Sequence, residues 1–147
     1  MTIVETIVVG YNDSPRSRAA LGWAAAEARQ RHARLLVVYV MSSVGEWELA
    51  AVQIDPDPIR REFERRLANE WTATLRDEGT EYDTSVVVGR VGRAIRHCAE
   101  QQHASMIVVG MSHRGTLAEL VSADHPEHYL ARHAVRPVVA VPADWSP

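Results

Sequence analysis

The sequence contains no lysine, and all sixteen of its basic residues are arginine. This absence excludes a Schiff-base lysine, the lysine of a P-loop and the lysine of a response-regulator receiver. Cysteine is almost absent too, because Cys98 is the only one, so no disulfide can form within the chain. Such cysteine usage is typical of a reducing compartment.

Long apolar runs are missing as well. The run Leu35–Met41 is far too short to cross a bilayer, and Met1–Glu5 lacks the basic start and apolar core of a signal peptide. We therefore expect a cytoplasmic protein with no membrane contact. The arginines are spread along a chain of net charge −3, which disfavours a nucleic-acid partner, because such a partner requires clustered basic residues.

What the sequence does contain is ordinary globular composition: 147 residues, of which 46% are hydrophobic and 24% charged. A chain of this length can bury roughly two thirds of its unfolded surface, enough for one core. We therefore predict one domain over residues 1–147.

Short β-branched runs alternate with helix-compatible segments, which predicts an α/β fold: a three-layer α/β/α sandwich around a parallel sheet. The predicted strands are Thr6–Gly10, Leu35–Met41, Tyr82–Val88, Met106–Gly110 and Pro137–Val141. The predicted helices run from Pro15 to His32, from Asp57 to Gly79, from Gly92 to Gln102 and from Pro126 to His133.

The second predicted helix carries large apolar residues four apart, a pattern that favours packing against the core over ligand binding: Ile59, Phe63, Leu67, Trp71 and Leu75. Cys98 falls inside the third helix and is expected to be an unreactive, buried thiol. Residues 41–58 are expected to form a loop with one helical turn near 46–52.

Ligands of open parallel sheets bind where the strands end. Gly10 and Gly110 stand at two such ends, where glycine lets backbone approach a ligand or simply serves a tight strand-to-helix turn. The 15-residue connection between Gly110 and Pro126 is long for a compact domain, and such connections are often functional.

Three stretches carry a specific resemblance: Ile7–Ala24, with its Gly10-Tyr11-Asn12-Asp13-Ser14 turn, Val88–Ile95, and Ile107–Pro142. Together they resemble the universal stress protein family over essentially the whole chain. The resemblance implies a five-stranded sheet of order 3-2-1-4-5, Rossmann-like and of the adenine nucleotide α-hydrolase type. It also implies a homodimer paired through Pro137–Val141, although tail residues such as Trp145 could cover that edge instead.

Nucleotide-binding members of this family gather glycines and a final serine or threonine around the phosphates. The first glycine of that motif corresponds to Gly110. The second falls at His113, with Gly115 as a displaced substitute, and the final pair falls at Asp124-His125, where a carboxylate would repel phosphate.

At the adenine end, the family's aspartate corresponds to Asn12, between Tyr11 and Asp13. The short side chain of Val40 would suit an adenine wall, and Gly10 would let the backbone approach a ligand closely. ATP or another adenine nucleotide is therefore a possible ligand of an altered site.

The histidines near the fourth helix could suggest a metal site, because His125 and His128 are three apart beside Asp124. No second cluster with ligand spacing supports this reading, so we expect no metal. Asp124 before Pro126 is better explained as a helix cap.

These patterns predict a stress-response regulator that acts by dimerisation and contacts with an unidentified protein partner, with adenine-nucleotide binding weakened or lost. The alternative is an ATP- or AMP-binding sensor that holds phosphates with Gly115, Thr116 and backbone near Ser122. We expect no enzymatic activity, since the sequence shows no P-loop and no acid–base pair with a clear spacing.

Overall fold

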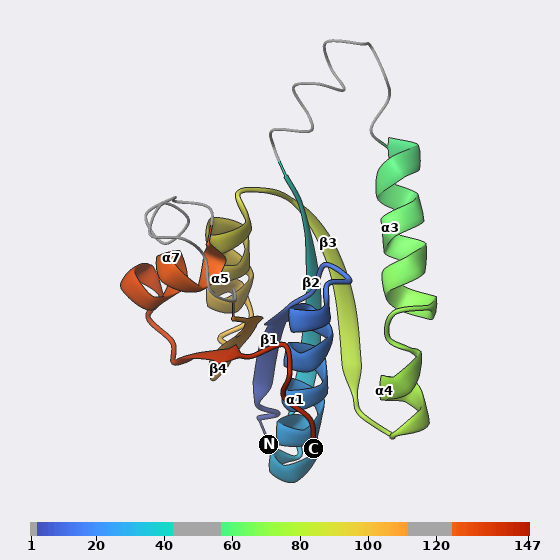
Figure 1. Ribbon diagram of the computed structural model, residues 1–147, viewed down its shortest axis with the longest axis vertical. Helices are drawn as coiled ribbons and strands as arrows, with labels where there is room; N and C mark the ends of the chain where they lie inside the picture. Colours follow the sequence, from blue (N-terminus) through green and yellow to red (C-terminus); the bar gives the residue numbers. More distant parts are fainter. Residues whose placement is uncertain (1–2, 43–56, 112–124) are drawn as a thin grey trace.

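The computed structural model describes residues 3–42, 57–111 and 125–147. Its centre is a parallel sheet of order β3-β2-β1-β4-β5 (Figure 1), as predicted. The strands are β1 (Thr6–Gly10), β2 (Arg34–Ser42), β3 (Tyr82–Gly89), β4 (Met106–Gly110) and β5 (Val138–Val141). Each begins and ends within one residue of the predicted run.

The central strands are apolar because both of their faces are covered. Val8 and Val9 of β1 and Val108 of β4 are fully buried. Val8 pairs with Leu36 of β2 and with Ile107 of β4, so β1 has a neighbour on each side. The strand order reverses beside β1, so the carboxyl ends of β1 and β4 lie next to each other, where a ligand site is expected.

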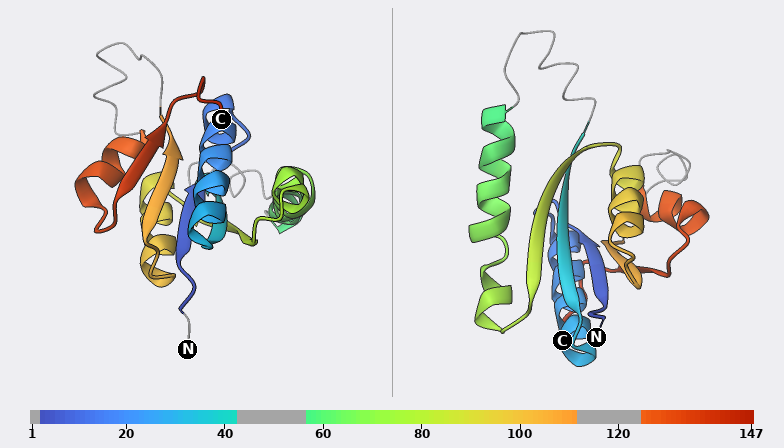
Figure 2. Two further views of the ribbon diagram at one scale, coloured as in Figure 1. Left: turned by 90° about the horizontal axis from the view of Figure 1, so that it is seen from below. Right: turned by 180° about the vertical axis from the view of Figure 1, so that it is seen from behind.

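Helices cover both faces of the sheet (Figure 2). One layer comprises α1 (Pro15–Arg31), α3 (Asp57–Asn69) and α4 (Ala73–Asp77), and the other comprises α5 (Val91–Gln101) and α7 (Pro126–His133). The larger apolar cluster lies under the first layer and the smaller under the second. The three-layer prediction is confirmed.

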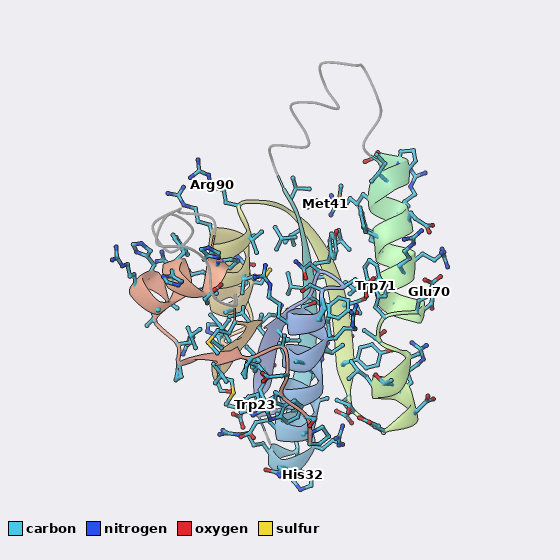
Figure 3. The ribbon with its side chains drawn as sticks, viewed as in Figure 1. Trp23, His32, Met41, Glu70, Trp71 and Arg90 are labelled. Atoms are coloured by element: carbon cyan, nitrogen blue, oxygen red, sulfur yellow. The ribbon has the colours of Figure 1, made fainter. Side chains whose placement is uncertain are left out.

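Helix α1 begins and ends where its sequence predicts. The Ser14 hydroxyl accepts a hydrogen bond from Ser17 N at 3.2 Å, and Pro15 follows in the first turn. Ala20, Ala24 and other small residues let the helix lie close against the sheet. The helix ends at His32, which takes a left-handed conformation with φ 53° (Figure 3).

The single helix predicted from Asp57 to Gly79 is wrong, because the chain breaks into α3 and α4 around residues 70–72. The Thr72 hydroxyl donates back to Leu67 O at 2.7 Å, which competes with the regular helical hydrogen bonds. The Arg76 guanidinium caps two further carbonyls at the end of α3, those of Ala68 and Asn69.

Of the remaining sequence-based expectations, the one for Cys98 can be compared with the structure, and those for two connecting segments cannot. Cys98 is half-buried on α5, and burial raises the pKa of its thiol, in agreement with an unreactive residue. The turn near 46–52 and most of the connection after Gly110 lie outside the described residues. Within the described part of the chain, no helix is long and apolar enough to cross a membrane.

Candidate ligand-binding site

A cavity of about 430 Å³ lies over the carboxyl ends of the strands and extends from α3 to α7. This volume falls within the range of small-molecule sites. Among its described lining residues are five that the sequence analysis singled out: Gly10, Tyr11, Asn12, Val40 and Gly110. The cavity therefore lies where strand order predicts a ligand.

One end of the cavity is apolar and partly aromatic. Tyr39 of β2 stacks on Phe63 of α3 with ring centroids 4.5 Å apart, and Trp71 stands behind them, 5.6 Å from Tyr39. Figure 3 shows Met41 near the end of β2 and Trp71 between α3 and the sheet. Tyr39, Val40, Met41 and Phe63 line the cavity as a wall suited to a flat, uncharged ring, and Trp71 lies outside this lining.

The loop after β1 is held by its own serines. Ser17 Oγ accepts hydrogen bonds from Asn12 N at 3.2 Å and from Ser14 N at 3.1 Å. The Asn12 side-chain oxygen accepts from Ser14 N and, at 2.6 Å, from Ser14 Oγ. The acceptor of Asn12 is thus committed to the start of α1, which leaves its amide N–H groups for a ligand.

Asp13 does not take over the role of the neighbouring Asn12. It adopts a left-handed conformation with φ 60°, and its carboxylate accepts from Arg18 at 3.0 Å and from the Tyr11 hydroxyl at 3.1 Å. Burial first, and then this carboxylate, raise the pKa of Tyr11 to about 12. The phenol therefore stays protonated and fixes the loop beneath the cavity.

The two strand-end glycines serve different contacts. A Cβ on Gly110 would lie 2.7 Å from the backbone carbon of Arg16, so glycine is required there for α1 to pack against β4. A Cβ on Gly10 would lie 2.8 Å from Ile95 Cδ1, the movable end of a side chain. Helix packing thus accounts for Gly110 before any ligand is considered.

The opposite end of the cavity is formed by the start of α7, where Pro126 and Glu127 line it. The Glu127 side chain is 10% exposed, and its carboxylate lies 3.9 Å from His125 Nδ1. His125 is the N-cap residue of α7, but its side chain makes no capping hydrogen bond. Arg16, the second residue of α1, also lines the cavity.

Several further lining residues were not predicted as part of the site, among them Arg16, Phe63 and Glu127. Phe63 was assigned to the core, correctly, yet its ring also reaches the cavity. Arg16 and Glu127 directly follow Pro15 and Pro126, the first residues of α1 and α7. Such prolines mark helix N-termini, which lie near the carboxyl ends of the strands in a parallel sheet. Of the predicted site residues, His113, Gly115 and Asp124 lie outside the described residues.

Metal binding finds no support where the structure is described, since residues 3–42, 57–111 and 125–147 contain no group of three or more potential ligands. His125 and His128 do approach each other, with ring centroids 5.7 Å apart. Two histidines alone do not complete the tetrahedral set that zinc requires.

The sheet order defines a Rossmann-like α/β protein with a cavity at its switch point, where ligands bind in such sheets. The profile of the universal stress protein family matches residues 4–142, and the chain belongs to that family. The predicted resemblance is confirmed. A comparison with curated proteins finds no match.

Solved structures with the same fold agree. A universal stress protein from Archaeoglobus fulgidus is 25% identical, with 95% of this chain and 94% of that chain covered and a TM-score of 0.68. A family protein from Burkholderia pseudomallei is 26% identical over 94% and 96%, with a TM-score of 0.66. An Archaeoglobus fulgidus universal stress protein in complex with dAMP is 23% identical over 96% and 99%, with a TM-score of 0.67.

Proposed function

We propose that this chain is a cytoplasmic, non-enzymatic stress-response regulator that acts as a homodimer through contacts with another protein. In this proposal its adenine-nucleotide binding is weakened relative to nucleotide-binding members of the family. An adenine site is supported by the apolar cavity wall at Val40 and by the dAMP complex of a protein with the same fold.

The observation that carries the weakened binding is the end of the cavity at α7. A helix N-terminus binds phosphate through free backbone N–H groups and its positive dipole end. Pro126 has no N–H to offer, and Glu127 brings a negative charge to the same turn. The described part of this end is therefore poorly suited to a triphosphate.

The dimer is supported by the outer edge of β5, which pairs with no other strand among the described residues. This strand pairs with β4 on one side and ends the sheet. Trp145, the alternative cover, packs against α1, where its ring would lie 3.4 Å from a Cβ on Gly22. An apolar edge strand that no described segment covers favours pairing with a second chain.

Two measurements on the purified protein test the proposal. Denatured protein is centrifuged and its supernatant run on an anion-exchange column, and thermal unfolding is followed with and without ATP. We expect no stoichiometric nucleotide and no thermal shift, together with a light-scattering mass of two chains. A bound adenine nucleotide at one per chain, or a monomer mass, would contradict the proposal.

The second candidate is an ATP- or AMP-binding sensor that uses a variant phosphate loop. It is favoured by the existence of the cavity itself, which a protein without any ligand would not need. The double variant Asp124→Gly with His125→Ser restores the residue types of the family motif. If the first proposal holds, calorimetry should show higher ATP affinity in this variant, and unchanged binding would count against it.

A further inference from the structure

Helix α5 carries a row of basic residues on its outer face. Arg90 is the N-cap residue of this helix, and Arg93 and His97 follow at intervals of three and four, which places the three side chains on one face. All three residues are exposed. Figure 3 marks Arg90 at the start of the helix. We call Arg90, Arg93 and His97 the basic ridge.

A hollow borders the basic ridge on each side, since α5 lies between β3 and α7 (Figure 2). The hollow beside β3, of about 400 Å³, is lined by all three ridge residues and by the half-buried Val87 and Ala94. The hollow beside α7, of about 570 Å³, shares Arg93 and His97 with the first. A partner chain that lies along the ridge therefore has room for side chains on both sides.

The charge of the ridge is not neutralised within the described part of the chain. Six arginines of α1 and α3 form ion pairs with carboxylates: Arg18, Arg29, Arg31, Arg60, Arg65 and Arg66. The side chains of Arg90 and Arg93 form no ion pair and no hydrogen bond with the residues that the structure describes. Glu100, the one carboxylate in the described lining of the two hollows, already accepts from Arg96 at 2.9 Å. Nor do Arg90 and Arg93 stabilise α5, because positive charge in the first turn opposes the helix dipole.

The chemistry of this surface favours an acidic protein segment as its partner. Guanidinium groups without a counter-charge attract carboxylates, with which they form two parallel hydrogen bonds. Val87 and Ala94 suit apolar side chains, which a nucleic-acid backbone does not have. The ridge spans roughly 10 Å at the helical rise per residue, a length that about three residues of an extended peptide cover.

We propose that the basic ridge and its two hollows form a docking surface for an acidic segment of a partner protein. This inference rests on the proposed action through protein contacts, and it names the surface and the chemistry of the partner. Carboxylates of the partner bind Arg90 and Arg93, and His97 donates an N–H whether neutral or charged. Apolar residues between the carboxylates contact Val87 and Ala94. None of the ridge residues is among the described residues that line the ligand cavity, so docking and nucleotide binding are measured separately.

Fluorescence anisotropy tests the proposal with a labelled peptide in which aspartate alternates with leucine. Arg93→Glu should weaken its binding about tenfold, because the variant removes an exposed ion pair and adds a repulsion of similar size. It should not lower the melting temperature, because an acidic residue in the first turn of α5 favours the helix. Arg61→Glu is the matched control: it changes the net charge equally at an exposed position of α3 and should leave binding unchanged. For the wild-type protein, binding should weaken as NaCl is raised, and a peptide with asparagine in place of aspartate should bind at least about tenfold less tightly.

Salt-sensitive binding of the acidic peptide that Arg93→Glu weakens and Arg61→Glu does not would support the docking surface. No binding to the wild-type protein, or equal effects of the two variants, would overturn it. Tighter binding of an oligothymidine of the same negative charge would make the ridge a nucleic-acid surface instead. A light-scattering mass that falls to one chain in Arg93→Glu alone would make it an interface between two copies. If the peptide does not bind while the wild-type protein is dimeric and free of nucleotide, only this inference fails and the tested parts of the proposed function stand.

Discussion

The two edges of the sheet meet solvent in different ways. Helix α3 packs beside β3. Its residue Arg60 donates a hydrogen bond from Nη2 to Val86 O of β3 at 3.2 Å. The Glu81 carbonyl points toward β2, because it accepts a hydrogen bond from Leu35 N. Successive backbone groups point to alternate sides of a strand, so the Val86 carbonyl points away from β2, to the outer edge of the sheet. A side chain of the same chain thus occupies one acceptor of this edge.

The β5 edge has no such cover among the described residues. Pro137 O and Val141 O accept from β4, at 2.9 Å from Ile107 N and 2.7 Å from Met111 N. The backbone groups of Val138 and Ala140 therefore point outward. The neighbouring Val135 is 78% exposed. Among the described residues, the β3 edge is thus covered in part by α3, whereas the outward backbone groups of β5 are available for the proposed pairing with a second copy.

The largest expected effect comes from blocking the β5 edge. Ala140→Pro removes an outward N–H without removing a hydrogen bond to β4, because proline is tolerated where its nitrogen faces away from the sheet. We expect light scattering to show the mass of one chain instead of two. Circular dichroism and thermal unfolding should remain close to those of the wild-type protein.

Ala140→Ser is the matched control, since it keeps the N–H and changes only the exposed side chain. It should remain dimeric. A dimer that survives Ala140→Pro would show that the chains associate through another surface, and the contrast between the two edges would then lose its functional meaning.

The fold was predictable because its strands are short apolar runs whose ends are marked by glycine or polar residues. The break between α3 and α4 was not. Trp71 and Leu75 continue the four-residue spacing of α3 across the break, so the apolar stripe appears uninterrupted. The side-chain hydrogen bonds at the end of α3, from Thr72 to Leu67 O and from Arg76 to Ala68 O and Asn69 O, do not show in the apolar spacing.

The candidate site was predictable in position but not in charge. Gly10, Asn12 and Gly110, three of the predicted site residues, all line the cavity, because strand order places them together. The contact that requires Gly110 joins β4 to Arg16, far apart in the sequence. Likewise, no local pattern shows that the second residue of α7, Glu127, faces the same cavity as the second residue of α1.

The covered β3 edge depends on how α3 ends, and Thr72 tests this dependence. Thr72 is fully buried, and its hydroxyl donates to Leu67 O. Thr72→Val leaves that carbonyl without its partner, so we expect the free energy of unfolding to fall by about 1–3 kcal/mol. Denaturant titration measures the change. Thr74→Val, at an exposed position of α4, should alter stability far less, and equal losses would contradict the assignment.

A smaller effect is expected from Arg60→Ala, which uncovers Val86 O at the β3 edge. Because Arg60 is exposed, we expect stability to fall by less than about 1 kcal/mol. The uncovered edge should instead favour association beyond the dimer, seen by light scattering at rising protein concentration. Arg61→Ala removes a neighbouring exposed arginine and should not do so. Identical behaviour of the two variants would mean that Arg60 does not protect the edge.

The smallest effect concerns the surface of α3 that faces away from β3. Hydrogen bonds from Arg65 and Arg66 lower the pKa of Glu62 from 4.5 to about 2. Since the folded-state pKa is lowered, the contribution of Glu62 is fully present above pH about 4.5 and is lost as pH falls through about 2. Wild-type and Glu62→Gln proteins should therefore differ slightly in thermal stability at pH 6 and converge at lower pH. A difference at pH 2 as large as that at pH 6 would show that Glu62 acts other than through its charge, and α3 would then cover β3 independently of these ion pairs.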